Sequence, residues 1–137
     1  MVHIFTKRLF LSFKGHIYNF LYKDNVKTLF LIDILYMKDI NAIYRFNNGD
    51  YIIAQLKSLL KKKIIKLIKK KIKKKCLIDT NNLHADVFSI TVYENLTQDE
   101  ILAVKDLIFK KIINHNFLLK NKQNSINLDV TIGCSKS

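Results

Sequence analysis

The stretch from Leu29 to Asp50 limits the fold of this chain more than any other. Thr28–Ile34 is an apolar run of strand length that carries one acid, Asp33, near its end. Such a run is typical of a central strand that is buried on both faces. Met37–Tyr44, which follows, has the pattern of a short helix. Because ligands of α/β sheets bind beyond the carboxyl ends of the strands, we expect a ligand site near Asp33.

Helical patterns lie on both sides of this stretch. Apolar residues recur every three to four positions over residues 6–23, which predicts an amphipathic helix. After a turn at Asn47–Gly49, Asp50 is expected to cap a long helix whose apolar residues continue to Ile68. The segment from Lys57 to Lys75 contains 11 lysines and no acid. We expect it to prolong this helix past the edge of the fold.

The second half of the chain predicts a hairpin, a helix and a last strand. Cys76–Thr80 and Val87–Tyr93 have the pattern of paired strands. Thr97 followed by Glu100 is a capping box, which marks the start of a helix. The last strand is predicted over Ile126–Cys134. Since strands otherwise alternate with helices, we expect one α/β domain over residues 1–137, with a mixed sheet flanked by helices.

The totals agree with one small domain. A chain of 137 residues with 49% hydrophobic residues can bury one core. Of its 24 basic residues, 11 lie in the lysine segment, so the rest carries 24 − 11 = 13 basic against 11 acidic residues. The two cysteines, Cys76 and Cys134, form no metal or disulfide motif, which favours a reducing compartment. No apolar run approaches the roughly 20 residues of a membrane span.

Eight residues of the first stretch match a known spaced pattern without a shift in register. They are Leu31, Asp33, Ile34, Lys38, Ile40, Asn41, Gly49 and Asp50. This pattern resembles that of the GGDEF family, the diguanylate cyclase domain. The family signature is expected a few dozen residues later, where His84–Phe88 stands and keeps only Asp86 and Phe88. The resemblance covers roughly residues 6–134 and implies a GGDEF-like (nucleotidyl cyclase-like) fold that lacks the last α/β unit, with a lysine-rich helical insertion at about 57–75.

The resemblance implies a metal and nucleotide site. In it, Asp33, the carbonyl of Ile34 and Asp86 would hold Mg²⁺, which prefers oxygen ligands. Asn41 and Asp50 would read the guanine edge of GTP, because an amide both donates and accepts while a carboxylate accepts from guanine N–H groups.

Val87 is the main departure from the family. Two GTP-loaded domains of that family join two GTP molecules into cyclic di-GMP, with an acid at this position. Valine can neither bind metal nor take a proton. His84 and Ala85 also replace two glycines of the signature. The resemblance therefore implies a bacterial, cytoplasmic domain that is catalytically inactive, with a regulatory role or weak GTP binding.

Other interpretations remain open. The chain is an active diguanylate cyclase with a divergent signature, or a basic adaptor that acts through Lys57 to Lys75, or a remnant without function. A solvated helix face is the plainest interpretation of the lysines. As a binding surface, the amphipathic basic run favours an anionic membrane, such as the inner membrane, over nucleic acid. The partners that the resemblance implies are a GGDEF or EAL-type signalling domain or a second copy of the chain.

Overall fold

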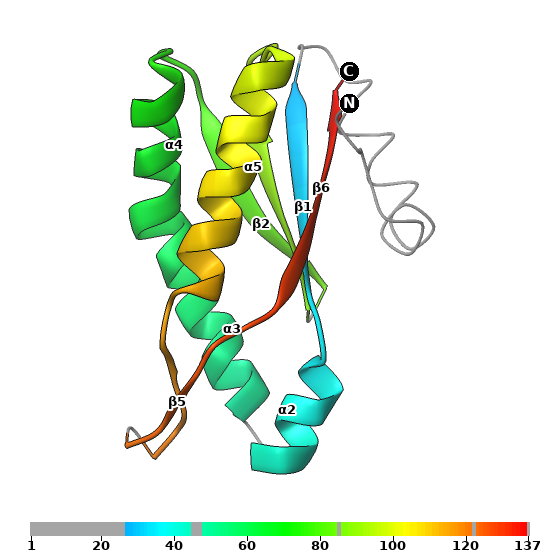
Figure 1. Cartoon of the computed structure of the whole chain (residues 1–137), viewed down its shortest axis with the longest axis vertical. Coiled ribbons are helices and arrows are strands. Elements are labelled where there is room, and N and C mark those ends of the chain that lie inside the picture. Colours follow the sequence, from blue (N-terminus) through cyan, green and yellow to red (C-terminus); the bar gives the residue numbers. More distant parts are fainter. Residues whose placement is uncertain (1–26, 45–47, 85, 122, 137) are drawn as a thin grey trace.

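The computed structural model describes residues 27–44, 48–84, 86–121 and 123–136 of the chain. The helix predicted over residues 6–23 lies outside these residues. The strands form a main sheet and a small hairpin, and the long helices cover one face of the main sheet (Figure 1). The elements in order are β1 (Thr28–Ile34), α2 (Met37–Tyr44), α3 (Asn48–Leu59), the π-helical turn η1 (Leu60–Ile64), α4 (Ile65–Ile72), β2 (Ile78–His84), β3 (Val87–Val92), α5 (Gln98–Ile113), β4 (Phe117–Leu118), β5 (Ser125–Ile126) and β6 (Val130–Lys136).

The main sheet has the strand order β2-β3-β1-β6, and every described pair of strands is antiparallel. The helical connections from β1 to β2 and from β3 to β6 join strands that have a third strand between them. This is the β-α-β-β-α-β arrangement of ferredoxin-like folds. The predicted α/β class is confirmed. The sheet is antiparallel and not mixed, because the strand that follows each helix does not pair with the strand that precedes it.

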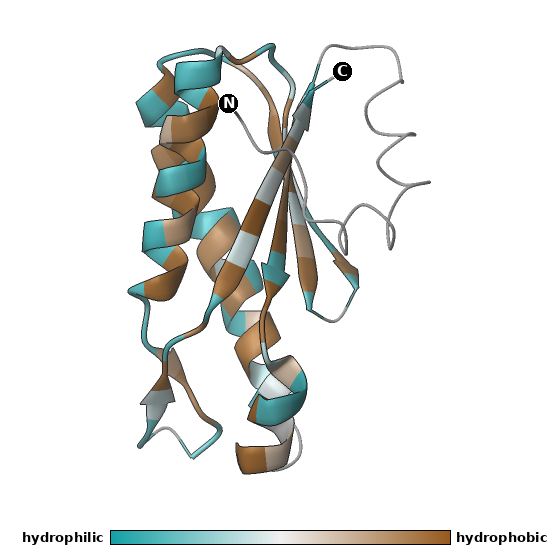
Figure 2. Ribbon diagram, turned by 45° about the vertical axis from the view of Figure 1, so that its right-hand side comes forward, coloured by the Kyte–Doolittle hydropathy of each residue, from teal (hydrophilic) through white to brown (hydrophobic). Residues whose placement is uncertain are grey.

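Strand β1 is the centre of the sheet, as predicted. All seven of its residues are buried, and it pairs with β3 on one side and β6 on the other. One face of β1, with Phe30, Ile32 and Ile34, belongs to the main hydrophobic core that the helices complete. Figure 2 shows the apolar sides of the helices turned toward the sheet.

A single long helical path runs from α3 through η1 to α4. Six of its buried apolar residues form a row with a spacing of four, and Leu59 is buried beside this row. In a straight α-helix such a row would rotate by about 40° per step, or roughly 200° over five steps. The π-helical turn at Leu60–Ile64 holds more residues per turn, and it therefore brings the row back onto the sheet. The row consists of Ile52, Leu56, Leu60, Ile64, Ile68 and Ile72.

Two expectations about this helix are wrong. The helix begins at Asn48, so Asp50 lies inside its first turn and is not the cap. The lysine-rich part does not project past the fold, because Ile68 and Ile72 are buried in the core and α4 packs on α5. Helix α4 ends at Ile72, and the residue that caps it, Lys73, has a left-handed φ of 55°. That this segment is an insertion stays a prediction.

The predicted hairpin and capping box are both present. Strands β2 and β3 pair antiparallel, although β2 begins at Ile78 and extends further, to His84. At the start of α5, the Thr97 hydroxyl accepts from the Glu100 N–H at 3.1 Å, and the Glu100 carboxylate accepts from the Thr97 N–H at 2.9 Å. The buried face of α5 also matches the expected spacing.

The last strand differs from the prediction. Ile126 belongs to β5, which pairs with β4 in a small separate hairpin, and β6 starts only at Val130. The Gln55 side chain supplies both a donor and an acceptor to this hairpin. Its amide nitrogen donates to the Leu118 carbonyl at 2.7 Å, and its oxygen accepts from the Leu118 N–H at 2.8 Å. In the described part of the chain, no helix is long and apolar enough to cross a membrane.

Replacing Ile68 by alanine should show that the lysine-rich helix is part of the core. Ile68→Ala removes a fully buried side chain, and we expect the free energy of unfolding in urea to fall by about 2–5 kcal/mol. The control Lys66→Ala changes the exposed side of the same helix and should cost less than about 0.5 kcal/mol. Equal small losses in both variants would contradict the packing of α4.

Glu100 should make the stability depend on acid pH. Hydrogen bonds from the Thr97 N–H and from Lys74 lower the pKa of this carboxyl. A lowered pKa in the folded state gives stability that is present above the unfolded pKa and is lost as the pH falls through the folded pKa. Chemical unfolding as a function of pH should therefore show a smaller loss below about pH 4.5 in Glu100→Gln, which keeps the capping acceptor. The same loss in both proteins would contradict this role.

Candidate functional site

The residues of the expected site come from separate segments and lie toward one end of the sheet. Asp33 and Ile34 end β1, Asp86 lies in the turn between β2 and β3, and Val87 begins β3. Helix α2 and the start of α3 lie beyond the end of β1 (Figure 1). These residues thus lie at the carboxyl end of the central strand, and their role as a ligand site stays a prediction.

Asp33 lies between two strands. Its exposed fraction is only 2%, and its Cα pairs with Val87 of β3 on one side and Thr131 of β6 on the other. Residues that pair directly across strands point to the same face of a sheet. The Asp33 carboxylate therefore has a valine and a threonine as its immediate cross-strand neighbours, and Val87 is itself 2% exposed.

A backbone hydrogen bond joins the hairpin turn to the end of β1. The Ile34 N–H donates to the Asp86 carbonyl at 2.8 Å. The Asp86 side chain is about one quarter exposed, and its Oδ1 lies 3.6 Å from Nδ1 of His84. The hairpin that carries the altered signature is thus held in place beside Asp33.

Asn82 shapes this turn, although nothing in the sequence singled it out. Its Nδ2 donates to the carbonyl of His84 and, at 3.0 Å, to that of Val87. The register of β2 against β3 shifts between Asn82 and His84. A signal was available, because asparagine often bonds nearby backbone in turns. His84 needs no glycine-like conformation here, since Tyr36 and Lys73 have the only positive φ values among the described non-glycine residues.

The link between β1 and α2 has a left-handed residue. Tyr36 has a φ of 61°, and its carbonyl accepts from the Ile40 N–H at 3.1 Å at the start of α2. For a residue other than glycine this conformation costs about 1–2 kcal/mol. The preceding Leu35 N–H donates to the Asp129 carbonyl at 2.9 Å, which fixes the link against the start of β6. The resemblance assigns the backbone at Tyr36 and Met37 to a phosphate, and both positions lie in this link.

The two residues expected to read guanine are on neighbouring helices. Asn41 lies in α2, but its side chain falls outside the described part of the structure. Asp50 is exposed in the first turn of α3, and α2 packs against α3. Their role toward guanine stays a prediction.

The oxygen groups near Asp33 come from the end of β1 and from the hairpin turn. The position directly across the strand pair from Asp33 holds the buried side chain of Val87, and Asp86 lies next to it in the turn. The described residues contain no group of three His, Cys, Asp or Glu side chains that could hold a metal. The roles of Asp33, Ile34 and Asp86 as ligands of Mg²⁺ stay predictions.

Comparisons with known proteins give a consistent result at the level of fold. No protein-family model and no curated protein matches the sequence. Among solved structures, the GGDEF domain of FimX from Pseudomonas aeruginosa is 16% identical, with a TM-score of 0.58, over 97% of this chain and 75% of that one. This chain has the fold of a GGDEF domain.

Two further solved structures have the same fold. The active GGEEF domain of a diguanylate cyclase from Vibrio cholerae is 17% identical, with a TM-score of 0.57, over 95% of this chain and 69% of that one. The diguanylate cyclase SiaD of Pseudomonas aeruginosa, solved with its activator SiaC, is 11% identical, with a TM-score of 0.59, over 96% of this chain. Our chain spans 45% of the SiaD chain. Identities this low establish the GGDEF fold, and the site residues must be judged by their own chemistry.

Placing an acid at position 87 should give the chain a second buried carboxylate that can hold a metal. Val87→Glu would bury a second carboxylate beside Asp33, and we expect it to lower the free energy of unfolding by about 3 kcal/mol or more. Millimolar Mg²⁺ should then raise the melting temperature of this variant, because a ligand that binds the folded state stabilises it.

The natural protein and Val87→Gln are the matched controls, and neither should respond to Mg²⁺. Glutamine has nearly the same size as glutamate but no charge. If Mg²⁺ raised the melting temperature of the natural protein as much as that of Val87→Glu, Asp33 would hold a metal without the second acid.

Proposed function

We propose that this chain is a catalytically inactive GGDEF-fold domain with a regulatory role in cyclic-di-GMP signalling. The observation that carries the proposal is the pair formed by Asp33 and Val87, adjacent across β1 and β3 and both buried. Cyclisation needs metal-bound carboxylates that position the attacking hydroxyl and the phosphate. With valine at the second position, the strand pair supplies one of these groups.

Weak GTP binding is part of the proposal. The left-handed link at Tyr36, the exposed Asp50 and the position of α2 support it, because they leave backbone and polar groups around the end of β1. Mg²⁺ often binds through one or two carboxylates together with substrate phosphates. In this proposal Mg²⁺ arrives with the nucleotide, and Asp33 and the Ile34 carbonyl face it.

In this proposal, the inactive domain acts by binding a protein partner. The similar SiaD structure contains an activator protein, which supports regulation of this fold by protein contacts. For this chain the candidate partners are a GGDEF or EAL-type signalling domain or a second copy of itself. The affinity for such a partner would depend on whether nucleotide is bound at the end of β1.

Two measurements on the purified chain test the proposal. Incubation with GTP and Mg²⁺ should give no cyclic di-GMP above a control without protein. Isothermal calorimetry should show binding of GTP in preference to ATP that requires Mg²⁺ and is lost in Asp33→Asn.

Asp79→Asn is the matched control for the calorimetry, because Asp79 lies near the opposite end of the sheet in β2. It should bind GTP like the natural protein. Formation of cyclic di-GMP that disappears in Asp33→Asn would overturn the inactive assignment. The absence of GTP binding would remove the nucleotide from the proposal and leave the protein partner.

A further inference from the structure

One side of the long helix carries lysines at regular spacing. Lys57, Lys61, Lys69 and Lys73 recur at multiples of four residues, and Ile65 occupies the remaining position of the row. All four lysines are exposed, whereas Ile65 is half-buried against the core. We call these four lysines the lysine ridge. At 1.5 Å per residue, the ridge is roughly 24 Å long.

The ridge borders two open hollows. The lower hollow has a volume of about 260 Å³, and it lies between Lys57 and Lys61 of the helix and the side chains of Thr80, Asn81 and Asn82 on β2. It therefore combines two cations with neutral hydrogen-bonding groups.

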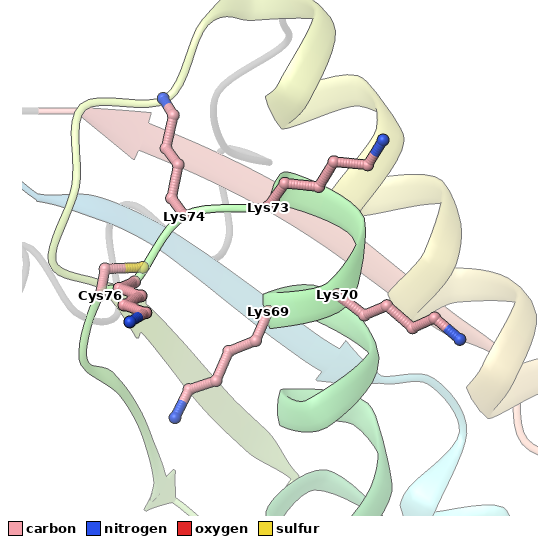
Figure 3. Close-up of a pocket in the computed structure, with 6 residues that line it drawn as sticks. Lys69, Lys70, Lys73, Lys74 and Cys76 are labelled. Atoms are coloured by element: carbon pink, nitrogen blue, oxygen red, sulfur yellow. The ribbon is translucent and has the colours of Figure 1, made fainter.

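The upper hollow, of about 490 Å³, lies at the carboxyl end of α4. Its lining consists of Lys69, Lys70, Lys73–Lys75 and Cys76. In Figure 3 the labelled lysine side chains spread in different directions from the helix end and do not converge on one point. This arrangement fits an extended anion better than a small one.

The charge of the ridge has little compensation nearby. The segment from Lys57 to Lys75 contains no acid. In the upper hollow, Lys74 forms an ion pair with Glu100 at 3.0 Å. Clustered like charges repel one another, so an extended polyanion bound along the ridge would be attracted by the lysines and would reduce their mutual repulsion.

The structure reverses the preference for a membrane over nucleic acid as the partner of the lysine ridge. A helix that lies in a membrane interface buries its apolar face in lipid. Here that face, with Ile64, Ile68 and Ile72, is already buried in the protein core. A flat bilayer also cannot enter the hollow between the helix and β2. The amphipathic pattern that favoured a membrane in the sequence is explained by the fold itself.

Nucleic-acid backbones match the groups that line the ridge. Lysine and asparagine side chains are common contacts of phosphate and sugar oxygens. In the lower hollow Asn81 is exposed, whereas the Thr80 hydroxyl and the Asn82 amide already donate to backbone carbonyls. The aromatic residue of the lower hollow, Phe88, is 1% exposed and cannot stack on a base. A surface without exposed aromatic side chains favours a duplex over single strands. We propose that the lysine ridge binds the sugar–phosphate backbone of double-stranded nucleic acid without reading its sequence.

Salt titration of a labelled DNA duplex, measured by fluorescence anisotropy with the full chain, tests this proposal. The logarithm of the affinity falls with the logarithm of salt concentration by about 0.9 per phosphate contact. The ridge variant combines Lys57→Gln, Lys61→Gln and Lys69→Gln, and its slope should be shallower by about 2.7.

The control variant removes the same charge from the same helix. It combines Lys62→Gln, Lys63→Gln and Lys66→Gln, all exposed and outside both hollows. Glutamine and lysine have similar helix propensities, and circular dichroism should show the helix unchanged in both variants. The slope of the control should change by less than about 1.

Three results would overturn the proposal. Equal losses in the ridge and control variants would mean that net charge alone drives the binding. Binding to vesicles of anionic phospholipid in the absence of duplex binding would assign the lysines to a membrane surface. If the natural protein did not bind duplex at about 0.15 M salt, the ridge would be a solvated helix face.

Discussion

The burial of β1 between two antiparallel neighbours is the constraint on which the described structure depends. All seven residues of the strand are inaccessible, and its register fixes the positions of both β3 and β6. One of its faces receives the apolar row of the long helix and the buried face of α5. A change in the pairing of β1 by one residue would turn the core residues to the opposite face, so the pairing and the core specify each other.

The same register determines which side chains lie beside Asp33. Because Asp33 pairs with Val87, an apolar side chain lies directly across the strand pair from the Asp33 carboxylate. The hairpin stays closed without glycine at His84, since Asn82 bonds the turn and the Ile34 N–H holds Asp86. The fold therefore closes this hairpin with a valine at position 87 and without glycine at His84. The requirements of the fold can be met without an acid at position 87, so the fold alone does not determine the activity.

Several local signals in the sequence are confirmed, although the expected Asp50 cap and the start of the last strand at Ile126 are wrong. The apolar run of β1, the helix α2 and the capping box of Thr97 and Glu100 depend on neighbours within a few residues, and each is confirmed. The antiparallel sheet was missed because the insertion of one strand between two others leaves no local trace. The π-helical turn did leave a trace, namely buried residues at a strict spacing of four, which exceeds the period of an α-helix.

For the candidate site, the sequence indicated that its residues lie at the carboxyl end of β1 but not the hydrogen bonds that hold them. Asp33 and Val87 followed from a pattern with known spacing, whereas Asn82 acts through a turn geometry that only the paired strands define. For the lysine segment, the amphipathic pattern favoured a membrane surface. The structure shows that the apolar half of this pattern is part of the protein core, and membrane association itself stays a prediction.

Anomalous diffraction from crystals grown with GTP and Mn²⁺ would test the central claim most directly. The claim is that the end of β1 has lost the two-metal site while keeping its shape. We predict that no pair of Mn²⁺ ions is bound beside Asp33, and that any single ion lies on the nucleotide phosphates. Two anomalous peaks about 3.5–4 Å apart at Asp33 would contradict the account, because they would show a complete metal clamp without an acid at position 87.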